Sequence, residues 1–157
     1  MEGFTAKAFD ELSLDELYAL LRARTDVFVV EQHCPYPELD GLDQTSLHLF
    51  CTDGAGRVRA YMRLYPKPGE PGTVRIGRVL TRERGVGLGG RLLAAGIEAA
   101  RTHYGAREIY VEAQSYATGY YEREGFRICS EEFLDDGIPH KQMRLRLDGA
   151  AAPAESP

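Results

Sequence analysis

The chain contains no tryptophan, only three cysteines and no long apolar run. Because Cys34, Cys51 and Cys129 are odd in number and form no Cys-x-x-Cys pair, the sequence predicts neither a disulfide framework nor a metal site. No apolar run approaches the roughly 20 residues that a membrane-spanning helix needs, and the first residues lack a signal-peptide core. We therefore expect a cytoplasmic protein that does not bind a membrane.

An excess of positive charge is also missing, since the formal net charge is −5. This argues against a general nucleic-acid-binding protein, whose electrostatic footprint should be basic. The 157 residues, 43% hydrophobic and 27% charged, suit one domain with a sizeable core. We place that domain at residues 1–148 and expect the small-residue tail, 149–157, to be disordered.

Apolar periodicity and turn residues predict an alternating order of strands and helices. The expected strands are 4–10, 46–52, 57–65, 73–81, 107–113, 126–133 and 140–147, and the expected helices are 14–27, 88–103 and 116–124. Hairpin turns between strands indicate antiparallel pairing, whereas the strand-helix-strand unit at 73–113 indicates one parallel step. The fold class is therefore α+β, with a mixed, mostly antiparallel twisted sheet, flanking helices and a central βαβ unit.

The most informative stretch is residues 74–91, where an apolar strand, a basic glycine-dense turn and a helix follow one another. This order places unpaired backbone N–H groups at a helix N-terminus, where the helix dipole also favours negative charge. Glycines allow close approach of a ligand because they have no Cβ. The stretch therefore predicts a site for a phosphate or diphosphate group.

Two nucleotide-binding motifs compete for this turn. Gly85, Gly87 and Gly90 satisfy a Gly-x-Gly-x-x-Gly dinucleotide fingerprint, with Glu112 as the acidic partner near the end of the next strand. Against it, the four polar residues 81–84 separate the strand from the first glycine, and hairpin strands precede the unit. A Walker loop is excluded because no Gly-Lys-Ser/Thr follows.

A second pattern fits better. Residues 84–89 read Arg-x-x-Gly-x-Gly after the strand, and Tyr121 lies four residues before Gly125-Phe126. Together these motifs resemble the acyl-CoA site of the GNAT superfamily of N-acetyltransferases. The segments that resemble its ElaA branch are 17–24, 27–32, 34–36, 38–43 and 136–140. One feature of the superfamily is missing, because Gln114 occupies the position at which an asparagine often ends the fifth strand.

The resemblance implies acetyl-CoA as co-substrate and no metal. By resemblance, strands 74–81 and 107–113 diverge at a bulge, and the pantetheine arm pairs with the backbone at Val79 and Leu80. Backbone amides of the turn would hold the diphosphate, from Arg84, Gly85, Val86, Gly87, Leu88, Gly89 and Gly90.

The resemblance also implies that Tyr121 is the general acid. A tyrosine hydroxyl, with a pKa of about 10, is a suitable proton donor to a thiolate of pKa about 8.5. Helical spacing predicts that the neighbouring Tyr120 points away from it. The general base stays open between Glu112, His140 and a glutamate of the 31–43 loop acting through water.

For the acceptor site we select Glu31, Tyr36, Asp40 and Arg63. The acidic loop at 31–45 either attracts a cationic amine or is a solvated loop. In strand 57–65, Val58, Ala60, Met62 and Leu64 alternate with Arg59, Tyr61, Arg63 and Tyr65. The second set either lines the acceptor groove or is the exposed side of a half-buried strand.

The predicted function is acetyl-CoA-dependent transfer of an acetyl group to a primary amine of a small molecule or peptide, by direct attack in a ternary complex. One alternative is an acyl-homoserine-lactone-synthase-like acyltransferase, suggested by Arg24, Phe28 and the acidic loop but weakened by the absence of tryptophan. Another is a non-catalytic acyl-CoA- or nucleotide-binding module. A homodimer would follow if the last strand were an exposed edge.

Overall fold

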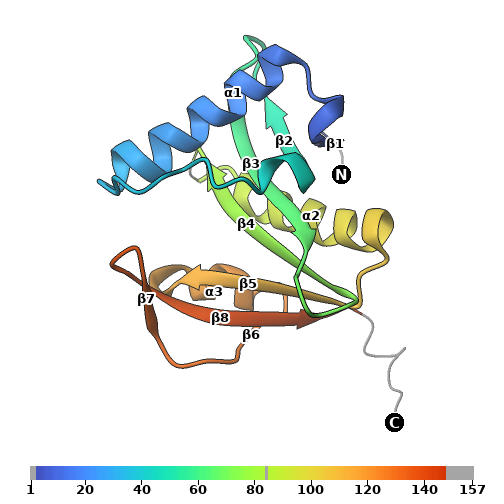
Figure 1. The fold of residues 1–157 in the computed structure, drawn as a ribbon, viewed down its shortest axis with the longest axis vertical. Coiled ribbons are helices and arrows are strands. Elements are labelled where there is room, and N and C mark those ends of the chain that lie inside the picture. Colours follow the sequence, from blue (N-terminus) through green and yellow to red (C-terminus); the bar gives the residue numbers. More distant parts are fainter. Residues whose placement is uncertain (1–2, 84, 148–157) are drawn as a thin grey trace.

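The computed structural model describes residues 3–83 and 85–147 (Figure 1). The strands are β1 (Thr5–Ala8), β2 (Leu47–Thr52), β3 (Val58–Pro66), β4 (Thr73–Thr81), β5 (Glu108–Gln114), β6 (Arg127–Ile128), β7 (Phe133–Asp135) and β8 (Ile138–Arg146). The helices are α1 (Leu14–Arg24), the π-helix η2 (Thr25–Glu31), α2 (Leu88–Tyr104) and α3 (Thr118–Glu122). Short 3₁₀ turns are η1 (Phe9–Glu11), η3 (Asp43–Thr45) and η4 (Ser115–Ala117). None of these helices is both long and apolar enough to cross a bilayer.

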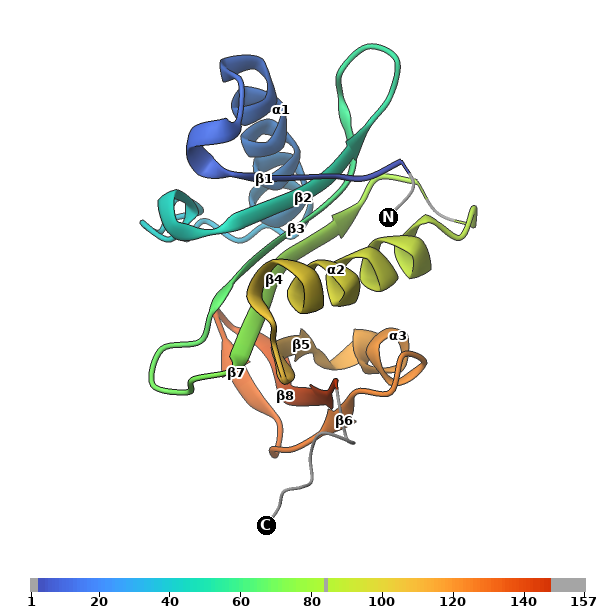
Figure 2. The same cartoon turned by 90° about the vertical axis from the view of Figure 1, so that its right-hand side faces the viewer.

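The strands form a single mixed sheet in the order β1-β2-β3-β4-β5-β8-β6, with β7 also pairing with β8. Every pairing is antiparallel except the one between β4 and β5. Helix α1 packs on one face, while α2 and α3 contribute to the core on the other face (Figure 2). This arrangement confirms the predicted α+β class and its central βαβ unit.

Strands β4 and β5 separate after a short paired stretch. Thr73, Val74 and Arg75 pair with residues 108–110, and no pairing continues beyond that point. The cause lies in β4 itself, because Arg78 has a φ of 53° and the β3–β4 register shifts beside it. A bulge of this kind bends a strand and increases its twist. The two strands therefore diverge, as the family resemblance implied (Figure 1).

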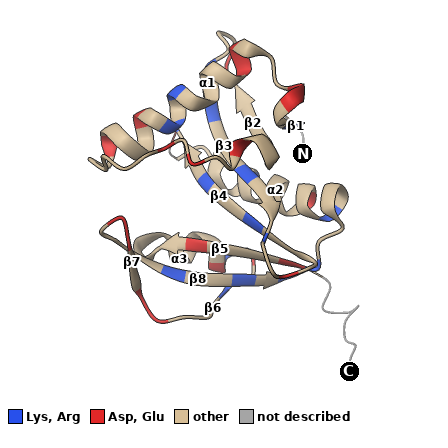
Figure 3. Cartoon of the chain, viewed as in Figure 1, with Lys and Arg blue, Asp and Glu red and all other residues tan. Residues whose placement is uncertain are grey.

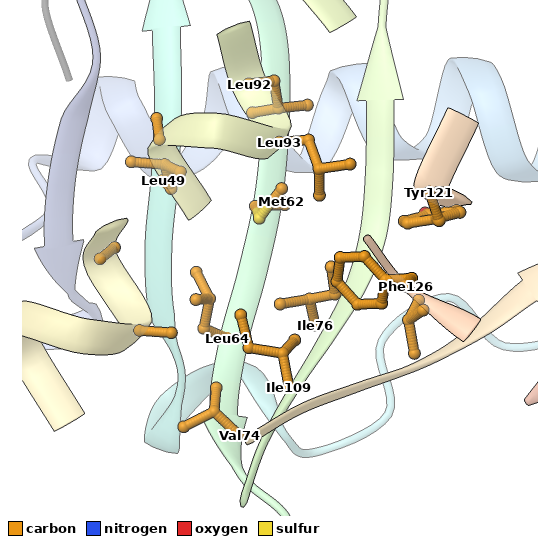
Figure 4. Close-up of a cluster of buried hydrophobic side chains, with 14 of the residues drawn as sticks. Leu49, Met62, Leu64, Val74, Ile76, Leu92, Leu93, Ile109, Tyr121 and Phe126 are labelled. Carbon is orange, nitrogen blue, oxygen red and sulfur yellow. The ribbon is translucent and has the colours of Figure 1, made fainter. Parts of the chain in front are cut away.

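The main core lies between the sheet and α2. Its fully buried side chains include Leu49, Met62, Leu64, Ile76, Leu92, Leu93 and Ile109 (Figure 4). Helix α2 supplies apolar side chains at helical spacing and ends at Gly105, whose φ of 61° suits a glycine cap. Tyr121 and Phe126 extend this core towards α3. The core thus holds the start of α2 and α3 in a fixed position relative to β4.

Several predicted boundaries were wrong. The predicted strand 4–10 ends with β1 at Ala8, where η1 begins, and the predicted helix 116–124 is η4 followed by α3. The capping box at Ser13 forms as expected, with Glu16 N–H bonded to the Ser13 Oγ, but the helical segment does not end at residue 27. It continues as η2 to Glu31 with wider turns. The predicted strand 126–133 is instead two short strands, β6 and β7, because residues 129–132 leave the ladder between their pairings with β8.

The last strand is not an edge. Strand β8 pairs with β5 on one side and with β6 and β7 on the other, so the structural reason for expecting a homodimer through β8 is absent.

Strand β3 also differs from prediction. A register shift opposite Cys51 turns Val58 to the α1 face, where it packs with Tyr61, and Ala60 stays on the α2 face.

Gly96 offers a test of the contact between α2 and the sheet. A Cβ at this buried helix position would lie 2.4 Å from the Met62 Sδ and 2.8 Å from its Cε. We expect Gly96→Val to lower the free energy of unfolding by about 1–3 kcal/mol through overpacking. The measurement is urea denaturation of both proteins.

Gly119→Val is the matched control, since nothing lies within 4 Å of a Cβ at that exposed helical glycine. Combining Gly96→Val with Met62→Ala should cost less than the sum of the two single changes. Strict additivity would show that the two residues do not contact each other as described.

Candidate active site

A cleft of about 840 Å³ opens where β4 and β5 diverge. Its walls come from η2 and the loop after it, β4, the glycine turn and start of α2, the end of β5, α3 and the β7–β8 turn. These segments are far apart in the sequence and meet only in the fold. The volume falls within the range of about 300–1,000 Å³ that small-molecule sites occupy.

One wall is the backbone of β4 beyond the bulge. Val79 and Leu80 line the cleft, and the described ladder gives this part of β4 no partner on the β5 side. Its other side pairs with β3 through Leu80 and Tyr61. Unpaired backbone groups on an open strand edge can pair with an extended ligand, as in strand addition.

The glycine turn forms the second wall. Gly85 and Gly87 have φ angles of 78° and 72°, in the left-handed region that favours glycine. Gly87 is the N-cap of α2, which has no side-chain cap and no acidic residue in its first turn. The N–H groups of residues 88–90 therefore lack an intrahelical acceptor, which suits a diphosphate. Val86 lies in this turn, and Gly89 and Gly90 lie in the first turn of α2. Arg84 lies outside the described residues.

Tyr120 and Tyr121 play different parts in the cleft. The Tyr120 hydroxyl donates a 2.6 Å hydrogen bond to the Gly89 carbonyl oxygen. Tyr121 is 6% exposed, packs on Phe126 and lines the cleft, and its hydroxyl bonds to no residue among those described. Burial raises the pKa of both hydroxyls, so each stays protonated at neutral pH. Tyr121 thus has a proton free to donate.

The expectation that Tyr120 points away from Tyr121 was wrong. Their ring centroids lie 4.9 Å apart in an edge-to-face arrangement. Successive residues on an α-helix are about 100° apart, so the edges of two large neighbouring rings can meet. Both side chains therefore reach the same cleft.

Both side chains named as candidate bases, Glu112 and His140, line the cleft. Glu112 is already engaged, since it lies 3.1 Å from the Arg75 Nη2 and accepts a 2.6 Å hydrogen bond from the Tyr110 hydroxyl. His140 is 8% exposed, and its Nδ1 lies 2.7 Å from the Ile138 carbonyl oxygen. Because a carbonyl only accepts, Nδ1 carries the proton and Nε2 keeps a lone pair in the neutral ring.

The four residues selected for the acceptor site divide into two pairs. Glu31 and the half-exposed Tyr36 line the cleft. Asp40 and Arg63 are not part of its wall. Arg63 is 2% exposed, and its Nη1 lies 2.9 Å from the Asp40 Oδ1. The geometry therefore gives this second pair a structural role, and contact with the acceptor stays a prediction only for the first pair.

A partly buried ion network, which sequence reasoning missed, holds the loop at 34–45 against the sheet. We use "ion network" for Arg24, Arg63, Arg78, Glu38, Asp40 and Asp43. Glu38 Oε2 lies 2.7 Å from the Arg24 Nε and 2.6 Å from the Arg78 Nε. Glu38, Asp40 and Asp43 are therefore not simply solvated, and they offer little free charge to a cationic amine, because arginines neutralise them. Its pairs join residues 14 to 40 positions apart, so no local sequence pattern signalled it.

The rest of the β3 face is buried too. Tyr61, Arg63 and Tyr65 are at most 8% exposed, and the Arg24 guanidinium lies 5.7 Å from the centroid of the Tyr61 ring. This face supports α1 and the loop at 34–45. It is neither the exposed side of a strand nor part of the cleft wall described above.

Comparison with known proteins agrees with this geometry. A model of the acetyltransferase (GNAT) domain matches residues 25–147. The chain belongs to the GNAT acetyltransferase family. It is therefore an acyltransferase. A UPF0039 protein of Schizosaccharomyces pombe is 42% identical over 147 residues, which cover 92% of this chain and 97% of that protein. The ElaA protein of Escherichia coli is 38% identical over 137 residues, covering 85% and 89%.

Solved structures of GNAT relatives have the same architecture. An acyl-CoA N-acyltransferase from Pseudomonas aeruginosa superposes with a TM-score of 0.82 at 42% identity, covering 90% of this chain and 97% of that one. The structure of E. coli ElaA gives a TM-score of 0.83 at 34% identity with the same coverage. These matches confirm the predicted ElaA-like branch.

A CoA-dependent acyl-homoserine lactone synthase also superposes, with a TM-score of 0.78, over 92% of this chain and 82% of that one. Its identity is only 20%, so it shares the fold alone.

The three cysteines are free. Within residues 3–83 and 85–147, no three His, Cys, Asp or Glu side chains gather in an arrangement suited to a metal ion.

The ion network predicts how stability depends on pH. Burial by itself raises the pKa of Asp40, but hydrogen bonds from Arg63 and the Leu42 N–H outweigh it and lower that pKa to about 2. Such a carboxylate stabilises the fold above its unfolded pKa, about 3.9, and loses that contribution as the pH falls through the folded pKa. We expect the free energy of unfolding to fall between about pH 4 and pH 2.

Asp40→Asn should be less stable at pH 6 and should lose less stability over that acidic window. Urea denaturation at a series of pH values measures both effects. Asp10→Asn, a change at an exposed carboxylate outside the ion network, is the control and should keep the parent's pH profile. An Asp40→Asn profile parallel to the parent's would contradict this account of the network.

Proposed function

We propose that this chain transfers an acetyl group from acetyl-CoA to a primary amine of a small molecule or peptide, by direct attack within one ternary complex. The observation that supports this most strongly is the coincidence of two features in one cleft. The uncapped amides at the start of α2 open onto the same space as the unpaired β4 backbone. We further propose that the reaction takes place in the cytoplasm.

The cleft fits coenzyme A in its chemistry. The backbone at Val79 and Leu80 would pair with the amide groups of the pantetheine arm, and the amides of residues 85–90 would take the diphosphate. A Cβ at Gly85 or Gly90 would meet nothing within 4 Å, so the space in front of the turn is open. When bound, acetyl-CoA supplies an activated thioester.

Acyl transfer to an amine needs a neutral nucleophile and a donor for the leaving sulfur. A new C–N bond forms at the thioester carbonyl carbon while the C–S bond breaks. The geometry favours the His140 Nε2 as the acceptor of the amine proton, because its lone pair is free and it lines the cleft. The Tyr121 hydroxyl would return a proton to the sulfur. Glu112 is paired with Arg75 and Tyr110 and would instead have a structural role in the cleft wall.

The test of this function is release of free thiol from acetyl-CoA with a panel of primary amines. Tyr121→Phe should lower kcat by about 10- to 1,000-fold, the range of a general acid or oxyanion donor, with a smaller change in KM for acetyl-CoA. Tyr18→Phe, at a side chain that is 72% exposed and outside the cleft wall, is the control and should match the parent. Normal turnover by Tyr121→Phe would remove Tyr121 from the mechanism.

Thiol release by no amine would instead favour a non-catalytic acyl-CoA-binding module. Lactone formation with long-chain acyl donors would favour the acyl-homoserine-lactone alternative. No contact in the cleft specifically supports either of these two functions.

His140→Asn separates the proposed base from a structural role. An asparagine amide can still donate to the Ile138 carbonyl, but it lacks a group in place of Nε2. We expect the variant to lose about 100-fold in kcat/KM while its free energy of unfolding, measured by urea denaturation, stays close to the parent's. Unchanged kcat/KM in His140→Asn would exclude His140 as the base.

A further inference from the structure

The mouth of the cleft carries acidic side chains on two opposite walls. Glu31 is the last residue of η2, while Asp135 ends β7 and Asp136 opens the turn into β8. All three are exposed and line the cleft. In Figure 3, acidic segments lie on the helical segment and on the β7–β8 turn, on the same side of the molecule.

Hydrogen bonds and strand register bring these two walls together. The Gln114 amide donates to the Gln32 side-chain oxygen at 3.3 Å, which links the residue after Glu31 to the end of β5. Gln114 lies opposite His140 in the β5–β8 register. His140 in turn lies opposite the first residue of β7, which is the strand that ends at Asp135. The acids therefore surround the end of the cleft that holds His140.

Arginines on the same cleft do not offset these acids. Arg75 is paired with Glu112, and Arg78 is paired with the ion-network acids. Arg123 follows α3, whose Tyr120 bonds to the glycine turn, so it belongs to the coenzyme end. Among the residues that the structure describes, Glu31, Asp135 and Asp136 form no ion pair. The His140 end thus has surplus negative charge.

Two polar atoms of largely buried side chains beneath these acids also lack partners. His140 and Tyr121 are 8% and 6% exposed, yet within the described part of the chain neither the His140 Nε2 nor the Tyr121 hydroxyl has a hydrogen-bond partner. Both side chains line the cleft. Because neither atom is bonded within the protein, both are available to a ligand that enters below the acidic rim.

We propose that the acceptor is a small aliphatic diamine, an inference that rests on the acetyltransferase function above. One nitrogen reaches the His140 Nε2 as the neutral nucleophile, while the second, an ammonium group, lies among Glu31, Asp135 and Asp136. An amino acid acceptor would bring a carboxylate against the same three carboxylates and would be repelled.

Three acceptors of equal length test this inference: 1,5-diaminopentane, 1-aminopentane and 5-aminopentanoate. The measurement is kcat/KM from thiol release with saturating acetyl-CoA. We expect the diamine to exceed the monoamine by about tenfold and the amino acid to be the poorest acceptor. The preference for the diamine should shrink with added salt, because the rim is exposed and its charges are screened.

Two variants assign the preference to the rim. Glu31→Gln and Asp136→Asn should each reduce the diamine-to-monoamine ratio by about threefold. Asp136 has a φ of 52° and precedes Gly137 at 77°, and an Asn-Gly pair suits such a turn, so the hairpin is retained. Glu131→Gln removes an exposed charge outside the cleft wall and should leave the ratio unchanged.

A monoamine or amino acid that matches the diamine would overturn the inference, while thiol release would still support the acetyltransferase function. A ratio unaffected by Glu31→Gln and Asp136→Asn would also overturn it. If acetyl-CoA released thiol with none of these acceptors or of the wider amine panel, both proposals would fail together.

Discussion

The site depends on one backbone constraint, which is the left-handed conformation of Arg78 inside β4. A non-glycine residue with a φ of 53° costs of order 1–3 kcal/mol and persists only when its surroundings determine it. Here the Arg78 guanidinium bonds to the Glu38 carboxylate and to the Glu38 carbonyl oxygen, at 2.6 and 3.2 Å. These bonds hold the bulge that separates β4 from β5. The cleft exists because of that separation.

The ion network therefore does two things at once. It holds the loop at 34–45 over β3 and β4, and it stabilises the bulge through Glu38. Because its three acids are matched by three arginines, the loop contributes little net charge to the cleft. The unpaired acids of the cleft mouth lie instead at the end of η2 and in the β7–β8 turn. Loop anchoring and the proposed acceptor selection thus involve different carboxylates.

Local patterns predicted the elements that build the coenzyme side. Strand 73–81 matches β4, and helix 88–103 differs from α2 by one residue, because glycine caps and apolar periodicity mark their ends. The ion network could not be predicted, since its pairs join residues 14 to 40 positions apart that only the fold brings together. The face of Val58 was missed because a bulge reverses the alternation that pattern reading assumes. The proposed catalytic roles depend on which lone pairs are free, such as that of the His140 Nε2. Only the folded structure shows which atoms have hydrogen-bond partners.

The central claim is that the opened β4 edge and the glycine turn together hold coenzyme A. Backbone amide chemical shifts of the isotope-labelled protein, followed during titration with coenzyme A, test it most directly. The account predicts the largest changes at Val79, Leu80 and the amides of residues 85–90, with small changes at the β2–β3 hairpin. Saturable changes that leave those amides unmoved and cluster elsewhere would contradict it.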